Sequence, residues 1–252
     1  DKKWVVKHIH AGNIDELLKA LPEIILGFSV DHPAVLPLRG YHIRKGETKD
    51  YNFYIKLPRM EKTLESKMKN QMSTKFPKED IIKYFYTLAC GFEYLHKKRI
   101  THCDIKPQNI LIDSEGNLKI SDIGSAQFMS EGETRYNAQD LLCTLPYLAP
   151  ESFVRSQRMK KDDLIKADSW SLGITIIELC LLQKTELRGD SAKEVLEQQI
   201  ETLVNEIGES YDNDLKEILL GLLEHNSEQR KKIEDVRELL ETKYSNKEGY
   251  FC

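Results

Sequence analysis

Hydrophobic residues in the first third of the chain follow the pattern of β-strands. Three segments there are rich in Val, Ile and aromatic residues: 4–9, 35–43 and 51–57. A polar turn at residues 45–49 joins the second segment to the third. The first third of the chain is therefore expected to form a small sheet.

An amphipathic stretch lies between the first two of these segments. Asn13 can cap it, and its apolar residues recur at helical spacing: Ile14, Leu17, Leu18 and Leu21. We expect a helix here that Pro22 interrupts or kinks, because proline has no backbone N–H to continue the helical hydrogen bonds.

The rest of the chain has mostly helical periodicity. A long amphipathic helix is expected over residues 79–98, with these apolar residues on one face: Ile81, Ile82, Phe85, Leu88, Ala89, Phe92 and Leu95. A hairpin with strands at 110–112 and 118–120 follows it. Four further helices are expected: 168–182, 191–207, 214–223 and 233–242. This order predicts a mixed lobe followed by a mostly helical lobe.

Composition and charge exclude several classes of protein. Hydrophobic residues make up 40% of the chain and charged residues 31%, which is the balance of a folded globular protein. The net charge of −4 is spread along the chain and forms no basic stripe, so we expect no nucleic-acid partner. The most apolar run, 170–182, contains Glu178 and is too short to span a bilayer.

The five cysteines indicate a reducing compartment. They are scattered, odd in number and without a CxxC pair: Cys90, Cys103, Cys143, Cys180 and Cys252. The charged segment 1–10 has no hydrophobic region of the kind that a signal peptide needs. We therefore expect the protein in the cytoplasm or the nucleus.

Candidate chemistry begins with residues 101–111, which read THCDIKPQNIL. This segment resembles the catalytic loop HRDLKxxN of eukaryotic protein kinases, with Cys103 in place of arginine. Thirteen residues after Asn109, the segment 122–124 reads DIG and resembles the metal-binding DFG element. A lone Asp-x-Lys is usually a surface ion pair, and a lone Asp-Ile-Gly is usually a turn. The two motifs together, at this spacing, are specific to the kinase pattern.

Three further elements strengthen the resemblance. Residues 144–151, TLPYLAPE, resemble the substrate-docking loop and APE end of a kinase activation segment. Residues 168–173, DSWSLG, resemble the start of the buried helix in the kinase large lobe. Arg230 stands where the family's late arginine pairs with the APE glutamate, here Glu151. Five elements in a fixed order resemble a kinase of the serine/threonine type.

The resemblance implies an α+β, two-lobed protein kinase fold. Residues 1–59 would form a small antiparallel-sheet lobe with one helix, and residues 60–252 a large, mostly helical lobe. The cofactors implied are ATP and Mg²⁺, and the partner is a protein with a Ser/Thr acceptor. Lys106 and Thr144 favour a serine or threonine acceptor over a tyrosine acceptor. Gln108 lacks the negative charge that selects arginine-rich peptides in some relatives.

Phosphoryl transfer leaves a protein mainly the tasks of positioning and neutralising charge. By resemblance, Asp104 accepts the proton of the attacking hydroxyl or orients it, and Lys106 neutralises charge on the moving phosphate. Asn109 and Asp122 offer the hard oxygen ligands that Mg²⁺ prefers. His102 is expected to be a packing residue beneath the site.

Residues 4–7, WVVK, resemble the VAIK strand, so that Lys7 would contact the α- and β-phosphates of ATP. Its helical partner is expected to be Glu23, nine residues before His32, rather than Glu16. Gly27 departs from the family's pattern, because relatives have a large apolar residue at this place.

The resemblance also implies an adenine site, whose place follows from counting back from Leu64. Leu57 becomes the gatekeeper and residues 58–60 the linker between the lobes. The residues that would contact adenine, through backbone groups of the linker or through apolar side chains, are Val5, Pro58, Met60 and Leu111.

Cys103 replaces the arginine that commonly pairs with a phosphorylated activation-loop residue, and that pairing needs a cation. Activity is therefore expected to be constitutive or controlled in another way. Ser130, Thr134 and Tyr136 remain candidate phosphosites.

Two alternatives stay open at this point. The glycine-rich loop GxGxxG should precede Lys7, yet residues 1–6 contain no glycine, so an upstream segment carries this loop or the domain lacks it. A pseudokinase that binds or scaffolds without turnover is the main rival function. A small-molecule kinase fits less well, because residues 144–151 resemble a segment that docks a polypeptide.

Overall fold

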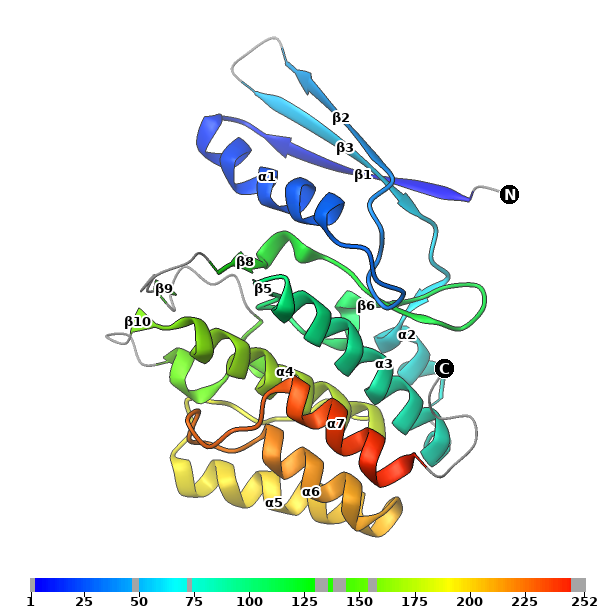
Figure 1. The fold of residues 1–252 in the computed structure, drawn as a ribbon, viewed down its shortest axis with the longest axis vertical. Coiled ribbons are helices and arrows are strands. Elements are labelled where there is room, and N and C mark those ends of the chain that lie inside the picture. The colour runs from blue at the N-terminus through cyan, green and yellow to red at the C-terminus, as the bar shows by residue number, and fades with distance from the viewer. Residues whose placement is uncertain are drawn as a thin grey trace.

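The computed structural model describes residues 3–46, 50–71, 74–129, 136–137, 144–153 and 158–245. They form two lobes, one above the other in Figure 1. The upper lobe contains β1 (Trp4–Ala11), α1 (Ile14–Ser29), β2 (Gly40–Lys45) and β3 (Tyr51–Pro58). The architecture is α+β as predicted, while the division of the chain at residues 59 and 60 stays a prediction.

The small-lobe sheet is antiparallel and has the strand order β1-β3-β2. Helix α1 lies against one face of this sheet (Figure 1). The buried core of the lobe consists of Ala11, Ile24, Leu38, Phe53 and Ile55. The strands predicted at 4–9 and 51–57 are confirmed as β1 and β3, whose buried apolar residues share one core with Ile24 of α1.

The strand predicted at 35–43 is wrong in its first half, because β2 begins at Gly40. The residues before it bind the large lobe instead. The N–H of Leu36 donates to the carbonyl of Ile120 at 2.8 Å, and the N–H of Ile120 donates to the carbonyl of Ala34 at 2.7 Å. Pro37 has no N–H for a sheet ladder. This connection therefore ties the two lobes together.

Pro22 was expected to interrupt or kink the first helix. An interruption is wrong, since α1 continues from Ile14 to Ser29, and a kink stays a prediction. Asn13 caps the helix as predicted, and its Oδ1 accepts the N–H of Glu16 at 2.9 Å. Proline removes one helical hydrogen bond, but the residues beyond it are held by packing. Ile24 and Leu26 are only 4% and 5% exposed. Burial in the tertiary structure outweighs the local break.

The large lobe is built around helices. They are α2 (Leu64–Asn70), α3 (Lys78–Lys97), α4 (Lys161–Leu181), α5 (Lys193–Ser210), α6 (Asn213–Leu222) and α7 (Ile233–Tyr244). Short strands lie between them: β4 (Lys62–Thr63), β5 (Ile100–Thr101), β6 (Ile110–Ile112), β7 (Leu118–Ile120), β8 (Gln127–Phe128), β9 (Tyr136–Asn137) and β10 (Arg158–Met159). Strands β6 and β7 form the predicted hairpin, and β4 pairs with β6.

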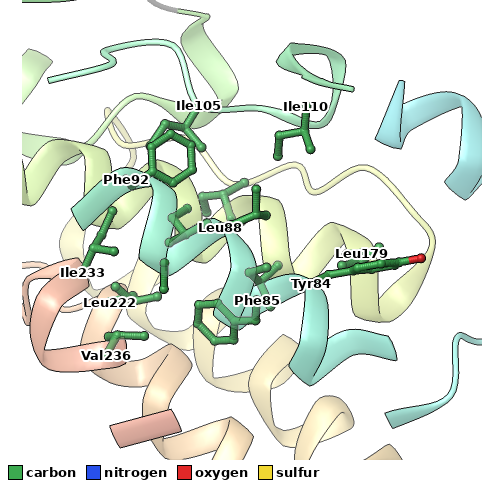
Figure 2. Packing of buried hydrophobic residues seen from close by; sticks show 14 of the residues in the cluster. Tyr84, Phe85, Leu88, Phe92, Ile105, Ile110, Leu179, Leu222, Ile233 and Val236 are labelled. Carbon is green, nitrogen blue, oxygen red and sulfur yellow. The ribbon is translucent and has the colours of Figure 1, made fainter. Parts of the chain in front are cut away.

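Helices α3 and α4 form the centre of the large-lobe core. Figure 2 shows Phe85, Leu88 and Phe92 of α3 among buried side chains of the neighbouring elements. The predicted helices corresponding to α3, α5, α6 and α7 are confirmed to within three residues at each end. No helix in the described part of the chain is long and apolar enough to cross a membrane.

Helix α4 begins at Lys161, seven residues before the predicted start. Its first two turns are mostly charged, so they lack the apolar period that marks a helix in a sequence. The N–H of Lys160 donates to Asp163 Oδ2 at 2.8 Å, which satisfies a backbone donor at the helix start. Polar capping rather than apolar burial therefore determines where α4 begins.

Candidate active site

Lys7 on β1 links the two lobes. Its Nζ lies 2.6 Å from Glu23 Oε1 on α1 and 3.1 Å from Asp122 Oδ1, just after β7. Burial would lower the pKa of Lys7, but the hydrogen bonds and charges of the two carboxylates outweigh burial and raise it. The other candidate, Glu16, accepts the N–H of Gly12 at 2.8 Å instead. The structure thus places the predicted lysine and glutamate together.

The turn at Asp122 holds its carboxylate between the lobes. Asp122 has a left-handed backbone, with φ 59° and ψ 58°, which is uncommon for a residue with a side chain. Ile123 next to it is buried in the large-lobe core. A Cβ on Gly124 would lie 3.2 Å from Glu23 Oε2, so a larger residue would press against that carboxylate. The buried Ile123 anchors the turn, and the side chain of Asp122 stays half exposed.

Asp168 of α4 holds the backbone of the catalytic loop. Its carboxylate is 1% exposed and accepts two N–H groups, those of His102 and Cys103, at 2.8 Å each. These bonds hold Cys103 at φ 63°, in the left-handed region. From its motif, Asp168 is predicted only as the start of a helix. The available signal in the sequence was an acidic residue two positions before Trp170. A carboxylate that is buried beside such a side chain needs hydrogen-bond donors.

His102 lies beneath the site, where it was expected. Its side chain is buried, and Nε2 donates to the carbonyl of Ser121 at 2.9 Å. Its ring also meets the ring of Phe92 edge-on, with the centroids 5.7 Å apart. The imidazole therefore packs and hydrogen-bonds beneath the site. That its role is structural stays a prediction.

The carboxylate of Asp104 accepts hydrogen bonds at both oxygens. Oδ1 accepts from Thr144 Oγ1 at 2.7 Å and from the Thr144 N–H at 3.1 Å. Oδ2 accepts from Lys106 Nζ at 2.7 Å and from Asn109 Nδ2 at 2.8 Å. Lys106 Nζ also donates to Thr144 Oγ1 at 2.6 Å. The three predicted catalytic residues therefore form one cluster with Thr144.

These contacts keep Asp104 ionised. Burial would raise the pKa of this carboxyl, but hydrogen bonds from Lys106, Thr144 and Asn109 and the charge of Lys106 outweigh burial and lower it. A lowered pKa stabilises the folded state above the unfolded pKa, and this stability is lost as the pH falls through the folded pKa. Asp104 is therefore a carboxylate throughout the neutral range.

Ser121 connects this cluster to Lys7. Its N–H and its Oγ both donate to the carbonyl of Asn109, at 2.9 Å each. Asn109 Nδ2 in turn donates to Asp104, and Asp122 follows Ser121 in the chain. Hydrogen bonds and one peptide link therefore join Asp104, through Asn109, to Asp122 and Lys7 without a gap.

A cavity of about 190 Å³ opens between the lobes at this place. Its lining includes Lys7, Glu23, Leu38, Leu57, Leu111 and Asp122. The gatekeeper candidate Leu57 and the predicted adenine contact Leu111 thus share a cavity with the phosphate-binding candidates. An apolar wall beside a few convergent charges is typical of a site for a small molecule.

The other three predicted adenine contacts do not line this cavity. Val5 lies opposite Leu57 in the sheet and is 43% exposed. Pro58 pairs with Trp4 at the end of β3, and Met60 follows in the connection to β4. Contacts of Val5, Pro58 and Met60 with adenine stay predictions.

Leu38 explains the glycine at position 27. A Cβ on Gly27 would lie 2.8 Å from Leu38 Cδ1, which is closer than real Cβ contacts. Leu38 is 9% exposed and belongs to the small-lobe core. The apolar side chain at this place therefore comes from the connection before β2 and not from α1, which sequence reasoning missed.

Glu151 and Arg230 form the predicted pair deep in the large lobe. Arg230 NH1 lies 2.7 Å from Glu151 Oε1, and NH2 lies 3.0 Å from Glu151 Oε2. The Arg230 side chain is fully buried, and its guanidinium lies 5.0 Å from the centre of the Trp170 ring. This bidentate pair ties the end of the activation segment to the segment before α7.

The candidate phosphosites cannot be compared with this geometry. Ser130 and Thr134 lie outside the described residues, and only the backbone of Tyr136 is described, in β9. Cys103 is a half-buried thiol whose Sγ lies 3.5 Å from Thr101 Oγ1. The place of the usual arginine is thus taken by a side chain without charge.

Asn109 and Asp122 fit a magnesium ion that arrives with a nucleotide. Asn109 donates through Nδ2 to both the carbonyl and Oδ2 of Asp104, which leaves its amide oxygen as a ligand. Within the described residues, no group of three or more His, Cys, Asp or Glu side chains could hold a metal ion. Mg²⁺ commonly binds one or two protein oxygens together with substrate phosphates. The residues present match that arrangement.

Comparisons with known proteins agree with the geometry. The chain is 32% identical to an Aurora kinase of Schizosaccharomyces pombe over 163 residues, which are 64% of this chain and 43% of that protein. It is 33% identical to Glycogen synthase kinase 1 of Pyricularia oryzae over 159 residues, 61% of this chain and 38% of that protein. It is 28% identical to an Aurora kinase of Candida glabrata over 226 residues, 88% of this chain and 58% of that protein.

These matched segments span between 38% and 58% of the relatives' own lengths. A family model described as the protein kinase domain matches residues 1–245, nearly the whole chain. Members of this family use ATP, typically with Mg²⁺. Since fold, site geometry and family model agree, the chain belongs to the protein kinase domain family.

Proposed function

We propose that this domain transfers the γ-phosphate of ATP to a serine or threonine hydroxyl of a protein. One observation carries the proposal: hydrogen bonds and one peptide link join Lys7 and Asp122, which line the cavity between the lobes, to Asn109 and Asp104. Phosphoryl transfer is accelerated mainly by positioning and by stabilising charge, and these four groups supply cationic, anionic and amide functions for both.

Each residue has a distinct task in this proposal. Lys7, held by Glu23, binds the α- and β-phosphates. Asn109 and Asp122 would hold Mg²⁺, which neutralises phosphate charge when bound. Asp104 orients the acceptor hydroxyl and accepts its proton, and Lys106 places a positive charge next to the group in transfer.

The rival function is a pseudokinase. The four polar side chains to which the proposal assigns turnover, Lys7, Asp104, Asn109 and Asp122, are all present, and each is paired within the site. Ile123 replaces the usual phenylalanine but is buried in the core at 8% exposure, so this departure leaves no hole at the turn. These observations favour an enzyme.

The test is a phosphotransfer assay on the full-length protein. With Mg²⁺ and γ-³²P-labelled ATP, we expect label on a generic protein substrate, recovered after acid hydrolysis as phosphoserine or phosphothreonine. EDTA should abolish the label, because Asn109 and Asp122 cannot hold the triphosphate without the metal. Label on tyrosine alone, or no transfer with Mg²⁺ present, would contradict the proposal.

We further propose that the domain works without a phosphate on its activation segment. The uncharged Cys103 offers no cation for such a phosphate. Replacing Ser130, Thr134 and Tyr136 together with alanine should therefore leave at least half of the phosphotransfer rate. A tenfold or greater loss that phosphate-mimicking glutamates restore at the same positions would overturn this.

A polypeptide, rather than a nucleic acid, is the proposed partner, supported by the even spread of charge along the chain. The proposed compartment is the cytoplasm or the nucleus. Cys90, Cys103 and Cys180 are thiols in the structure, which is compatible with a reducing environment.

A further inference from the structure

Ser121, which lies between β7 and Asp122, is bonded to the catalytic loop through three polar groups. Its N–H and its Oγ both donate to the carbonyl of Asn109 at 2.9 Å, and its own carbonyl accepts from His102 Nε2 at 2.9 Å. Ser121 is only 8% exposed, so these bonds are shielded from water. The residue therefore connects the two candidate magnesium ligands, Asn109 and Asp122.

The two bonds that reach the carbonyl of Asn109 differ in origin. The bond from the Ser121 N–H continues the ladder of the β6–β7 hairpin by one step, because Ile110 pairs with Ile120. Any residue other than proline at position 121 could make this bond. The bond from Oγ needs a hydroxyl, and the carbonyl oxygen has two lone pairs with which to accept both donors. The second bond is therefore specific to this side chain.

The side chain of Asn109 is held by a separate set of bonds. Its Nδ2 donates to the carbonyl of Asp104 at 2.9 Å and to Asp104 Oδ2 at 2.8 Å. These bonds fix the plane of the amide, whereas the two bonds from Ser121 fix the backbone that carries it. Both sets together determine where the amide oxygen of Asn109 can meet a metal ion.

Asp122, the other candidate ligand, is held less firmly. Its side chain is half exposed, and within the described residues its carboxylate pairs with Lys7 at 3.1 Å. Its left-handed backbone conformation persists only where neighbouring residues hold it. Ile123 holds one side of Asp122 by burial, and Ser121 holds the other side by hydrogen bonds. A looser Ser121 would let the carboxylate move relative to Asn109.

We propose that Ser121 is a positioning residue, whose hydroxyl holds Asn109 and Asp122 at the separation that a magnesium ion needs. Mg²⁺ demands nearly ideal octahedral geometry, so a small displacement of its protein ligands weakens its binding. Groups that hydrogen-bond behind the ligands of a metal commonly tune its affinity. This inference rests on the proposed function, because it concerns the same site, and it names what sets the dependence of that site on magnesium.

The test measures how much Mg²⁺ strengthens nucleotide binding to the full-length protein. The probe is a fluorescent N-methylanthraniloyl derivative of ATP. The measured quantity, called the metal gain, is the ratio of the Kd of this probe in EDTA to its Kd in saturating Mg²⁺. In Ser121→Ala the metal gain should fall about twofold to tenfold, the net effect of one hydrogen bond.

The Kd in EDTA distinguishes positioning from direct contact. Ser121 also lines the cavity between the lobes. If its hydroxyl contacted the nucleotide directly, Ser121→Ala would weaken binding in EDTA as much as in Mg²⁺. We expect the Kd in EDTA to stay the same within error, because Lys7 and Glu23 are untouched.

Two further variants separate positioning from a loss of stability. Ser169→Ala removes another buried hydroxyl of the large lobe, whose Oγ donates to the carbonyl of Ile165 at 3.2 Å within α4. This control should leave the metal gain unchanged, even where it lowers the melting temperature as much as Ser121→Ala does. Ser121→Thr keeps the hydroxyl and should restore most of the metal gain that Ser121→Ala loses.

Failure of this inference and failure of the proposed function give different results. An unchanged metal gain in Ser121→Ala, an equal loss in Ser169→Ala or Ser121→Thr, or an equal weakening in EDTA would overturn the inference. A natural protein that shows the metal gain but transfers no phosphate would remove only the proposed function. A natural protein that transfers phosphate but binds the probe equally with and without Mg²⁺ would remove only the role of Ser121.

Discussion

Replacing Asp104 with asparagine should lower kcat for protein phosphorylation by about 10²–10⁴-fold, the range that a positioned proton acceptor contributes. The amide has nearly the shape of the carboxylate but accepts no proton. It also turns an NH₂ group toward Lys106 or Thr144, both of which donate to Asp104 in the structure. Steady-state phosphotransfer with radiolabelled ATP measures the effect.

ATP binding should survive this change, because Lys7 and Asp122 are untouched, and a Kd for nucleotide within about threefold of the natural value is expected. The matched control is Asp113→Asn in the turn between β6 and β7. Asp113 accepts the N–H groups of Glu115 and Asn117 there, away from the cluster around Asp104, so activity should stay the same. Asp104→Asn protein with more than a tenth of the natural kcat would remove Asp104 from its proposed role.

Arg230→Ala should destabilise the protein by about 3–5 kcal/mol, the cost of breaking a buried ion pair from one side. The change leaves the carboxylate of Glu151, which is 8% exposed, without its bidentate partner. It also removes donors from the carbonyls of Lys166 and Glu224. For a domain of this size the melting temperature should fall by about 6–20 °C, as measured by calorimetry or circular dichroism.

Arg188 offers a control with the same chemistry and different burial. It pairs with Asp190 through two bonds of 2.9 and 2.7 Å, but its side chain is 66% exposed. Arg188→Ala should therefore leave the melting temperature unchanged within error. Equal melting temperatures for the two variants would show that burial does not determine how much the Arg230–Glu151 pair contributes to stability.

Local signals in the sequence predicted most helices of the large lobe well. The apolar residues of α3 recur on one face, and that face is the one buried against α4 and α7. Periodicity failed where a segment is stabilised by something other than an apolar face. The charged start of α4 at Lys161, and the connection from Ala34 to Leu38, bind through polar groups or to another lobe.

The candidate site was predictable to the extent that its residues lie in contiguous motifs. Residues 101–111 and 122–124 carry Asp104, Lys106, Asn109 and Asp122. The side chains of the first three form one cluster, and Ser121 links Asp122 to it through the carbonyl of Asn109. The clamp from Asp168 onto the loop backbone was not predictable. It depends on a side chain that reaches backbone N–H groups more than 60 residues away.

The sequence by itself determined the family, the order of a mixed lobe before a helical lobe, and the identity of the polar groups. Each of these depends on residues that lie close together along the chain. Only the tertiary structure decided which acid faces Lys7 and how Leu38 takes the place left at Gly27. These are contacts between distant segments. Their free energy comes from burial and charge that exist only once the lobes have packed.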